Sequence, residues 1–129
     1  MPTFSRAERL KSRKLISRLF REGNSYVAYP LRVLWLAPDE AERLHAGFST
    51  AGPVQFAVSV PRRVFKTAVA RNLLKRRIRE AYRLQKHLFY EKLAGSDQQV
   101  ALMVVYIGKE ELPYAAIEAG VKKMIAKFG

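Results

Sequence analysis

The chain has 129 residues, 49% of them hydrophobic, and a formal net charge of +13. This predicts a single domain over residues 1–129 with one core and an anionic partner. The sequence has no cysteine, which excludes disulfides and thiolate metal sites, and no apolar run approaches the roughly 20 residues that span a bilayer. The first residues also lack the apolar segment of a signal peptide. We therefore expect a cytoplasmic protein with no membrane partner.

Hydrophobic periodicity and turn residues predict an α+β fold with the element order α-β-β-β-α-β-α. Ser12 and Gly23 bound the first helix, Pro30 divides the first two strands, and Pro113 opens the last helix. The predicted elements are a helix over about 12–22, two strands within 25–36, a loop over 38–53, a strand over 54–60, a helix over about 66–93, a strand over 100–107 that is buried on both faces, and a helix from 113 to 128.

The long helix and the loop before it carry most of the charge. Residues 62–86 hold ten Lys or Arg residues and one acid, Glu80. At 100° per residue, one arc of about 140° forms what we call the basic face: Arg71, Asn72, Lys75, Arg76, Arg79, Arg83 and Lys86. The other side is expected to be buried, through Ala70, Leu74, Ile78, Ala81, Leu84 and Leu88.

The order of the charges indicates a nucleic-acid partner. Like charges four residues apart cost a few tenths of a kcal/mol each, whereas helices that are merely soluble alternate their signs. A row of cations matches the regularly spaced phosphates of RNA or DNA. Asn72 adds a group that can bond a base edge or a sugar hydroxyl. An acidic lipid or protein surface is the alternative partner.

No catalytic constellation is present. His45 and His87 have neither a carboxylate partner nor the spacing of metal ligands, and we expect both on the surface. The acids Asp39, Glu40 and Glu42 are expected to lie in a solvated loop. If the protein takes part in a reaction, another component supplies the chemistry.

A second binding surface is predicted between the first helix and the first strands. The helix side that carries Ile16 and Phe20, together with the aromatic segment 26–36, predicts an apolar cleft beside basic side chains. Such a cleft suits single-stranded nucleic acid, because bases stack on rings while the backbone meets cations. The alternative for Phe20 is a plain core residue.

Residues 58–83, VSVPRRVFKTAVARNLLKRRIREAYR, resemble the signature of the bacterial ribonuclease P protein family. There the pattern R-N-x-x-K-R-x-x-R-E follows a strand, a basic pair and a short loop. Residues 8–25 resemble the family's opening block. The resemblance implies a four-stranded sheet with helices packed on it and a left-handed β-α-β crossover. Pattern reasoning alone would predict a right-handed crossover, because about 98% of such crossovers are right-handed.

The resemblance also implies a function. The family's protein is the RNA-binding, non-catalytic subunit of an endoribonuclease, with one protein for each catalytic RNA. That RNA, with Mg²⁺, removes the 5′ leader of precursor tRNA. The implied contacts to the catalytic RNA are Arg62, Arg63, Lys66, Arg71, Asn72, Lys75, Arg76, Arg79 and Arg83. The implied leader cleft is formed by Ile16, Phe20, Arg32 and Leu34.

Four positions depart from the family's pattern. Leu73 stands where many relatives have Arg, Ile16 and Leu34 stand where others often have aromatic residues, and Pro61 replaces a commoner Ser. The alternative function is that of a structural RNA-binding protein, such as a ribosomal protein or an RNA chaperone, which has no need of the R-N-x-x-K-R-x-x-R-E pattern. A helix-turn-helix DNA reader is excluded, because the strand predicted over 54–60 stands where that motif needs its first helix.

Overall fold

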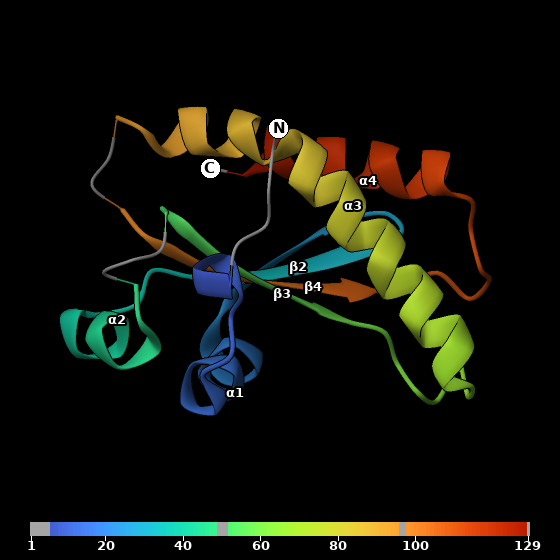
Figure 1. Cartoon of the computed structure of the whole chain (residues 1–129), viewed down its shortest axis with the longest axis horizontal. Helices are drawn as coiled ribbons and strands as arrows, with labels where there is room; N and C mark the ends of the chain where they lie inside the picture. Colours follow the sequence, from blue (N-terminus) through green and yellow to red (C-terminus); the bar gives the residue numbers. More distant parts are fainter. Residues whose placement is uncertain (1–5, 49–51, 96–97, 129) are drawn as a thin grey trace.

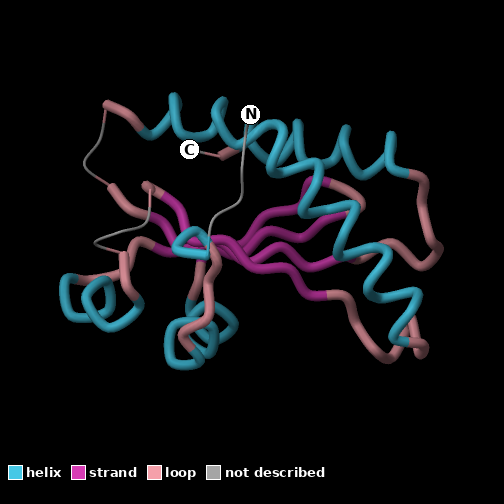
Figure 2. Tube along the Cα trace, in the orientation of Figure 1, coloured by secondary structure: helices cyan, strands magenta, loops and turns pink. Residues whose placement is uncertain are grey.

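The structure is a computed structural model that describes residues 6–48, 52–95 and 98–128. Its elements have three layers, in which α3 and α4 cover one face of the sheet while α1 and α2 lie on the other side (Figures 1 and 2). The elements are a 3-10 turn Arg6–Glu8, α1 Arg13–Glu22, β1 Asn24–Ala28, β2 Leu31–Leu36, α2 Glu40–Ala46, β3 Val54–Ser59, α3 Ala68–Leu93, β4 Val100–Tyr106 and α4 Tyr114–Lys127. The predicted order is confirmed, with the 3-10 turn and α2 added.

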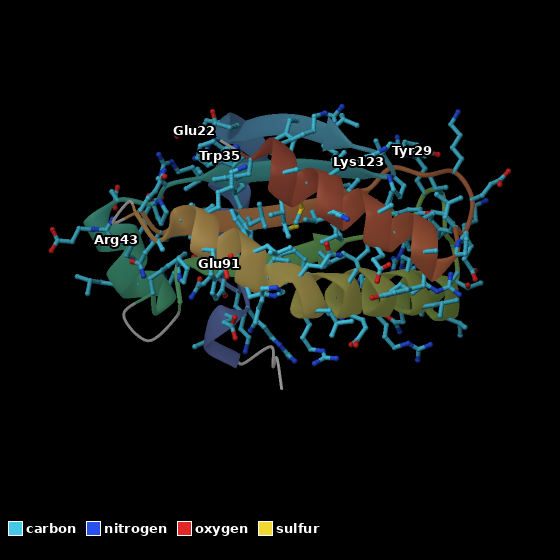
Figure 3. The ribbon with its side chains drawn as sticks, turned by 90° about the horizontal axis from the view of Figure 1, so that it is seen from above. Glu22, Tyr29, Trp35, Arg43, Glu91 and Lys123 are labelled. Atoms are coloured by element: carbon cyan, nitrogen blue, oxygen red, sulfur yellow. The ribbon has the colours of Figure 1, made fainter. Side chains whose placement is uncertain are left out.

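The four strands form one sheet in the order β1-β2-β4-β3. The pairs β1–β2 and β2–β4 are antiparallel, whereas β3 runs parallel to β4 and is joined to it by α3. This β3-α3-β4 crossover is left-handed. The hand can be followed in Figure 3, which views the sheet from the side that α3 and α4 cover. Strand β4 is central and almost wholly buried, as its continuous apolar sequence predicts.

A core cluster lies on each face of the sheet. Under α3 and α4, the ring of Phe56 stacks on Tyr82 with centroids 3.9 Å apart, and Ile78 is fully buried. On the opposite face, α1 places Leu15 and Leu19 in a second cluster of buried side chains. Because both faces of the sheet are covered, α1 is fixed against the strands and one side of it remains available for binding.

Gly23 closes α1, as predicted. Its φ is −69° and its backbone is extended, so it does not take the left-handed conformation that glycine often adopts at a helix end. A Cβ at this position would lie 2.5 Å from the carbonyl oxygen of Leu19. Glycine is therefore required by a close approach of the backbone rather than by a positive φ. The predicted N-cap is confirmed, because Ser12 accepts a hydrogen bond of 3.3 Å from the amide of Leu15.

The loop predicted over residues 38–53 was wrong in part, because it contains α2. The carboxylate of Asp39 accepts a hydrogen bond of 2.8 Å from the amide of Glu42, and Glu42 accepts one of 2.9 Å from the amide of Asp39. This reciprocal capping box satisfies two amides at the helix start, and Gly47, with φ of 76°, closes the helix. Residues 49–51 of the predicted loop lie outside the described residues.

The predicted buried side of α3 was also wrong at two positions. Leu84 and Leu88 are 40% and 43% exposed. At 100° per residue, the centre of the buried stripe lies roughly 70° closer to the basic face than predicted. The large rings of Tyr82 and Phe89 account for this rotation, since burying their large apolar surfaces gives the most favourable free energy. The buried residues of α3 are Leu74, Ile78, Ala81, Tyr82, Phe89 and Leu93.

None of the described helices is long and apolar enough to cross a membrane.

Candidate nucleic-acid interface

The start of α3 and the loop before it extend past the ends of the strands (Figure 1). Phe65 anchors this loop, because its buried ring meets Tyr106 edge to face at 5.5 Å and its amide donates 3.0 Å to the carbonyl of Pro61. The three cations of the loop point into solvent: Arg62, Arg63 and Lys66. The loop therefore presents positive charge on a fixed backbone.

Arg71 has a structural task at this end of the helix. Its Nη1 donates to the carbonyl oxygens of Phe65 at 2.9 Å and Lys66 at 3.0 Å. The side chain is half-buried and ties the loop to the first turn of α3. Since a guanidinium has five donors, Arg71 retains donors for an anion while it holds the loop.

The middle of the basic face is open to solvent. Asn72, Arg76 and Arg79 are exposed and Lys75 is half-buried. Among the described residues, no acid forms an ion pair with Lys75, Arg76 or Arg79. Side chains tipped with nitrogen project from the edge of α3 that faces away from α4 (Figure 3). These cations give the helix a strong attraction for a polyanion.

The basic face is shorter than predicted. Lys86 does not stand free, because its Nζ lies 2.6 Å from a carboxylate oxygen of Glu8 and its side chain is only 13% exposed. Arg83 pairs with Glu80 on the same helix, with Nε 3.1 Å from the carboxylate. The rotation of the buried stripe toward Tyr82 explains why Lys86 faces the protein instead of solvent.

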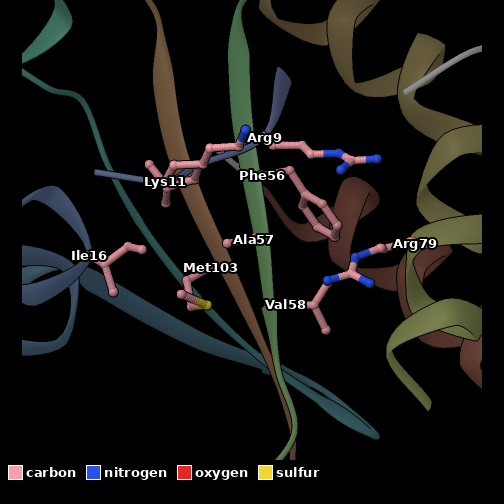
Figure 4. Close-up of a pocket in the computed structure, with 9 residues that line it drawn as sticks. Arg9, Lys11, Ile16, Phe56, Ala57, Val58, Arg79 and Met103 are labelled. Carbon is pink, nitrogen blue, oxygen red and sulfur yellow. The ribbon is translucent and has the colours of Figure 1, made fainter. Parts of the chain in front are cut away.

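A pocket of about 410 Å³ opens between α1, the edge of β3 and the middle of α3 (Figure 4). Its apolar lining includes Ile16 of α1 and Met103 of β4. No acid lines it, and the lining contains three cations: Arg9, Lys11 and Arg79. An apolar floor with a cationic rim suits a strand of nucleic acid whose bases leave water while its phosphates meet cations.

The structure divides the four residues predicted for this cleft. Ile16 lines the pocket, and Phe20, one turn further along α1, is 57% exposed and so is not a core residue. Arg32 is exposed on β2. Leu34 is buried under α1 at 8% exposure, so its side chain offers almost no contact surface. Reasoning from the sequence missed Arg9 and Lys11, for which the only signal was the basic character of the N-terminal residues.

The described residues offer no candidate metal centre. No three His, Asp or Glu side chains among them gather closely enough to hold a metal ion. His45 and His87 are exposed, as predicted. The carboxylate of Glu42 is engaged by the guanidinium of Arg18, which ties α1 to α2.

Comparisons with known proteins identify the family. The family model described as Ribonuclease P matches residues 4–129. The ribonuclease P protein component of Porphyromonas gingivalis strain W83 is 36% identical over 132 residues, which cover 98% of this chain and 88% of that protein. That of Chlorobaculum tepidum is 31% identical over 105 residues, which cover 78% of this chain and 65% of that protein.

Solved structures give the same result for the fold. The ribonuclease P protein of Thermotoga maritima superposes with a TM-score of 0.69 at 18% identity, covering 94% of this chain and all of the other. That of Staphylococcus aureus gives a TM-score of 0.62 at 19% identity, covering 93% and 95% of the two chains. The match along almost the whole sequence, on a fold that presents the R-N-x-x-K-R-x-x-R-E pattern to solvent, establishes that this chain belongs to the ribonuclease P protein family.

Proposed function

We propose that the protein is the RNA-binding subunit of a ribonuclease P ribonucleoprotein, which removes the 5′ leader from precursor tRNA. In this complex the RNA subunit performs the hydrolysis and the protein holds RNA. The observation that carries the proposal is the R-N-x-x-K-R-x-x-R-E pattern on a solvent-facing helix, in a chain that the family model matches over residues 4–129. A ribosomal protein or RNA chaperone has no need of that pattern.

The two surfaces of the protein suit two different RNA partners. The loop cations and the start of α3 project past the ends of the strands, where the backbone of a large folded RNA can reach them. The implied residues there are exposed or half-buried: Arg62, Arg63, Lys66, Arg71, Asn72, Lys75, Arg76 and Arg83. Phosphate contacts of this kind fix position without reading sequence, which suits the role of a subunit that stays bound.

The pocket beside α1 suits the single-stranded leader. Ile16 and Lys11 line the pocket itself. Outside its lining, the exposed ring of Phe20, one turn further along α1, adds apolar surface for bases, and Arg32 on β2 adds positive charge for the backbone. A double-stranded tRNA stem is too wide to bring its stacked bases into such a pocket, so the cleft distinguishes precursor from mature tRNA. Base stacking on an aromatic side chain contributes about 1–3 kcal/mol.

The protein's own residues supply charge and position rather than reaction chemistry. Because the described acids and histidines do not form a metal site, the proposal assigns the required Mg²⁺ to the RNA and no catalytic step to a protein side chain. With a net charge of +13, the protein weakens the repulsion between the catalytic RNA and its RNA substrate. It should therefore reduce the concentration of salt that the RNA needs for cleavage. The proposed stoichiometry is one protein for each RNA.

The experiment that tests the proposal is affinity purification of the tagged protein from its own cells, followed by sequencing of the bound RNA. We expect one large RNA in near-stoichiometric amount that cleaves precursor tRNA in Mg²⁺. The control is the variant Arg76→Ala, which should recover less of this RNA. Recovery of ribosomal RNA alone, or of many RNAs in equal amounts, contradicts the proposal.

A further inference from the structure

The first turns of α3 carry two neighbouring apolar side chains beside the basic face. Val69 is 79% exposed, the highest fraction among the large apolar side chains that the structure describes. Leu73 lies one turn further along the same side of α3 and is half-buried. We call these two residues the apolar pair. They lie at the end of α3 that projects past the ends of the strands (Figure 1).

The apolar pair contributes little to the stability of the fold. A β-branched side chain loses rotamer freedom in a helix, so valine is a weaker helix former than alanine. At 79% exposure, Val69 recovers little of this cost through burial. Single exposed apolar residues are common on protein surfaces, but here Leu73 continues the apolar surface across one helical turn. Contiguous exposed apolar surface marks a place of interaction.

The charges around the apolar pair indicate the kind of partner. Asn72 follows Val69 by three residues and Arg76 follows Leu73 by three, so each is a neighbour on the helix surface, and both are exposed. Lys66 is exposed in the loop just before α3. Among the described residues, no acid forms an ion pair with Lys66 or Arg76. This surface attracts a polyanion and repels a second copy of a chain with a net charge of +13.

An apolar side chain does not bind phosphate, so the apolar pair meets another part of the RNA. In a double helix the faces of the bases are stacked on one another and are closed to a side chain. In loops and bulges, unpaired bases expose their faces. Covering such a face with aliphatic carbon removes apolar surface from water, which is favourable. The partner that fits best is therefore an unpaired base whose flanking phosphates meet the cations of the basic face.

The backbone that carries the apolar pair is fixed in the free protein. The hydroxyl of Thr67 accepts a hydrogen bond of 3.2 Å from the amide of Ala70 at the start of α3. Nη1 of Arg71 donates to two carbonyl oxygens of the preceding loop, at 2.9 and 3.0 Å. Val69 lies between these contacts in the sequence. A surface that is already ordered loses little conformational entropy when it binds.

We propose that Val69 and Leu73 bind one unpaired base of the catalytic RNA, beside the backbone contacts assigned to Asn72 and Arg76. The inference rests on the proposed function and adds a base contact to the phosphate contacts of the basic face. Phosphate contacts position a protein on RNA without reading its sequence. A contact with an unpaired base gives the protein a means of recognising one loop or bulge of its own catalytic RNA.

The first test measures the affinity of the protein for its catalytic RNA over a series of salt concentrations. Val69→Thr and Leu73→Gln keep the approximate size of each side chain and add no charge, but make it polar. Leu84→Gln, at a partly exposed position on the same helix and outside the apolar pair, is the matched control. We expect Kd to rise about four-fold in Val69→Thr and at least ten-fold in the double variant, as loss of apolar burial does.

The salt series separates this loss from a loss of phosphate contacts. In the variants of the apolar pair, the slope of log K against log salt concentration should equal that of the wild type, because no counterion is involved. In Arg76→Ala the slope should fall by about 1. Thermal unfolding of each variant shows whether the fold is retained. If Leu73→Gln lowers the Tm, Val69→Thr alone decides, because Val69 is exposed.

The second test locates the base by chemical modification of the catalytic RNA with dimethyl sulfate and with a carbodiimide, which together modify all four unpaired bases. At saturating protein, one base should be protected by the wild type and by Arg76→Ala, and should become reactive with the double variant Val69→Thr and Leu73→Gln. The same pattern of protection with the double variant as with the wild type would overturn the inference.

The affinity measurements can overturn it as well. An unchanged Kd in Val69→Thr, an equal loss in Leu84→Gln, or a changed salt slope in the variants of the apolar pair each contradicts a base contact at these two residues. Unchanged affinity together with weaker self-association in sedimentation velocity assigns the apolar pair to a second copy of the chain instead. If the wild-type protein itself has no salt-dependent affinity for the catalytic RNA, it is the proposed function that fails.

Discussion

Replacing Phe20 by alanine separates binding from folding at the proposed leader cleft. Phe20 is 57% exposed, so less than half of its surface is buried. Full burial of a phenylalanine side chain stabilises a fold by about 1.5–3 kcal/mol. The substitution should therefore lower the free energy of unfolding by about 1 kcal/mol or less. If the ring stacks on a leader base, its loss should cost about 1–3 kcal/mol of affinity for precursor tRNA, which is roughly a 5- to 150-fold increase in Kd.

The assay compares dissociation constants for precursor and mature tRNA with the reconstituted holoenzyme, alongside thermal unfolding of the free protein. Leu44→Ala is the control, since Leu44 is an apolar side chain that is 69% exposed on α2 and belongs to neither the pocket nor α1. Mature tRNA has no leader, so its affinity should be the same for wild type and Phe20→Ala. Equal losses for both RNAs, together with a clearly lower Tm, would refute the assignment of Phe20 to the cleft.

Three further predictions follow from the geometry of α3 and its surroundings. Ile78→Ala, at a fully buried position, should lower the free energy of unfolding in urea by about 2–5 kcal/mol. Leu84→Ala, at a position that is 40% exposed, should lower it much less. Similar losses for the two variants would place the buried side of the helix elsewhere. Arg76→Ala should leave the Tm unchanged and weaken binding to the catalytic RNA. It should also reduce the slope of log K against log salt concentration by about 1. An unchanged slope would show that Arg76 contacts no phosphate. Burial raises the pKa of Tyr82 and Tyr90 above the ordinary 10.0, so the folded protein keeps protons that the unfolded chain releases. The contribution of these two groups to stability should be complete below about pH 10 and should be lost as the pH rises above it. Urea midpoints that stay unchanged above about pH 10 would contradict the burial of these hydroxyls.

Local signals were sufficient for most of the fold. The cap at Ser12, the break at Pro30 and the start of α4 after Pro113 are each fixed by residues adjacent in sequence, and each is confirmed. The capping box of α2 was equally local, since Asp39 and Glu42 have the spacing that starts a helix. The segment is short and contains two glycines between two prolines, and for this reason its acids are predicted to lie in a loop.

Contacts between distant segments could not be predicted. The buried side of α3 depends on where Tyr82 finds space against Phe56, and this requires knowledge of how β3 packs on the helix. The pairing of Lys86 with Glu8 links residues 78 positions apart, and nothing in the periodicity of α3 distinguishes Lys86 from Lys75. The R-N-x-x-K-R-x-x-R-E pattern could be identified because its residues are contiguous in the sequence. The cationic rim of the pocket could not, because its residues come from the N-terminal segment and from α3.

The division of labour between protein and RNA is the central claim, and one cleavage assay tests it most directly. Precursor tRNA is incubated in Mg²⁺ with the catalytic RNA alone, with the rigorously RNA-free protein alone, and with both, over a series of salt concentrations. We predict no cleavage by the protein alone, cleavage by the RNA at high salt, and cleavage at markedly lower salt when the protein is added. Cleavage by the RNA-free protein, or an unchanged salt requirement in the mixture, would contradict the account.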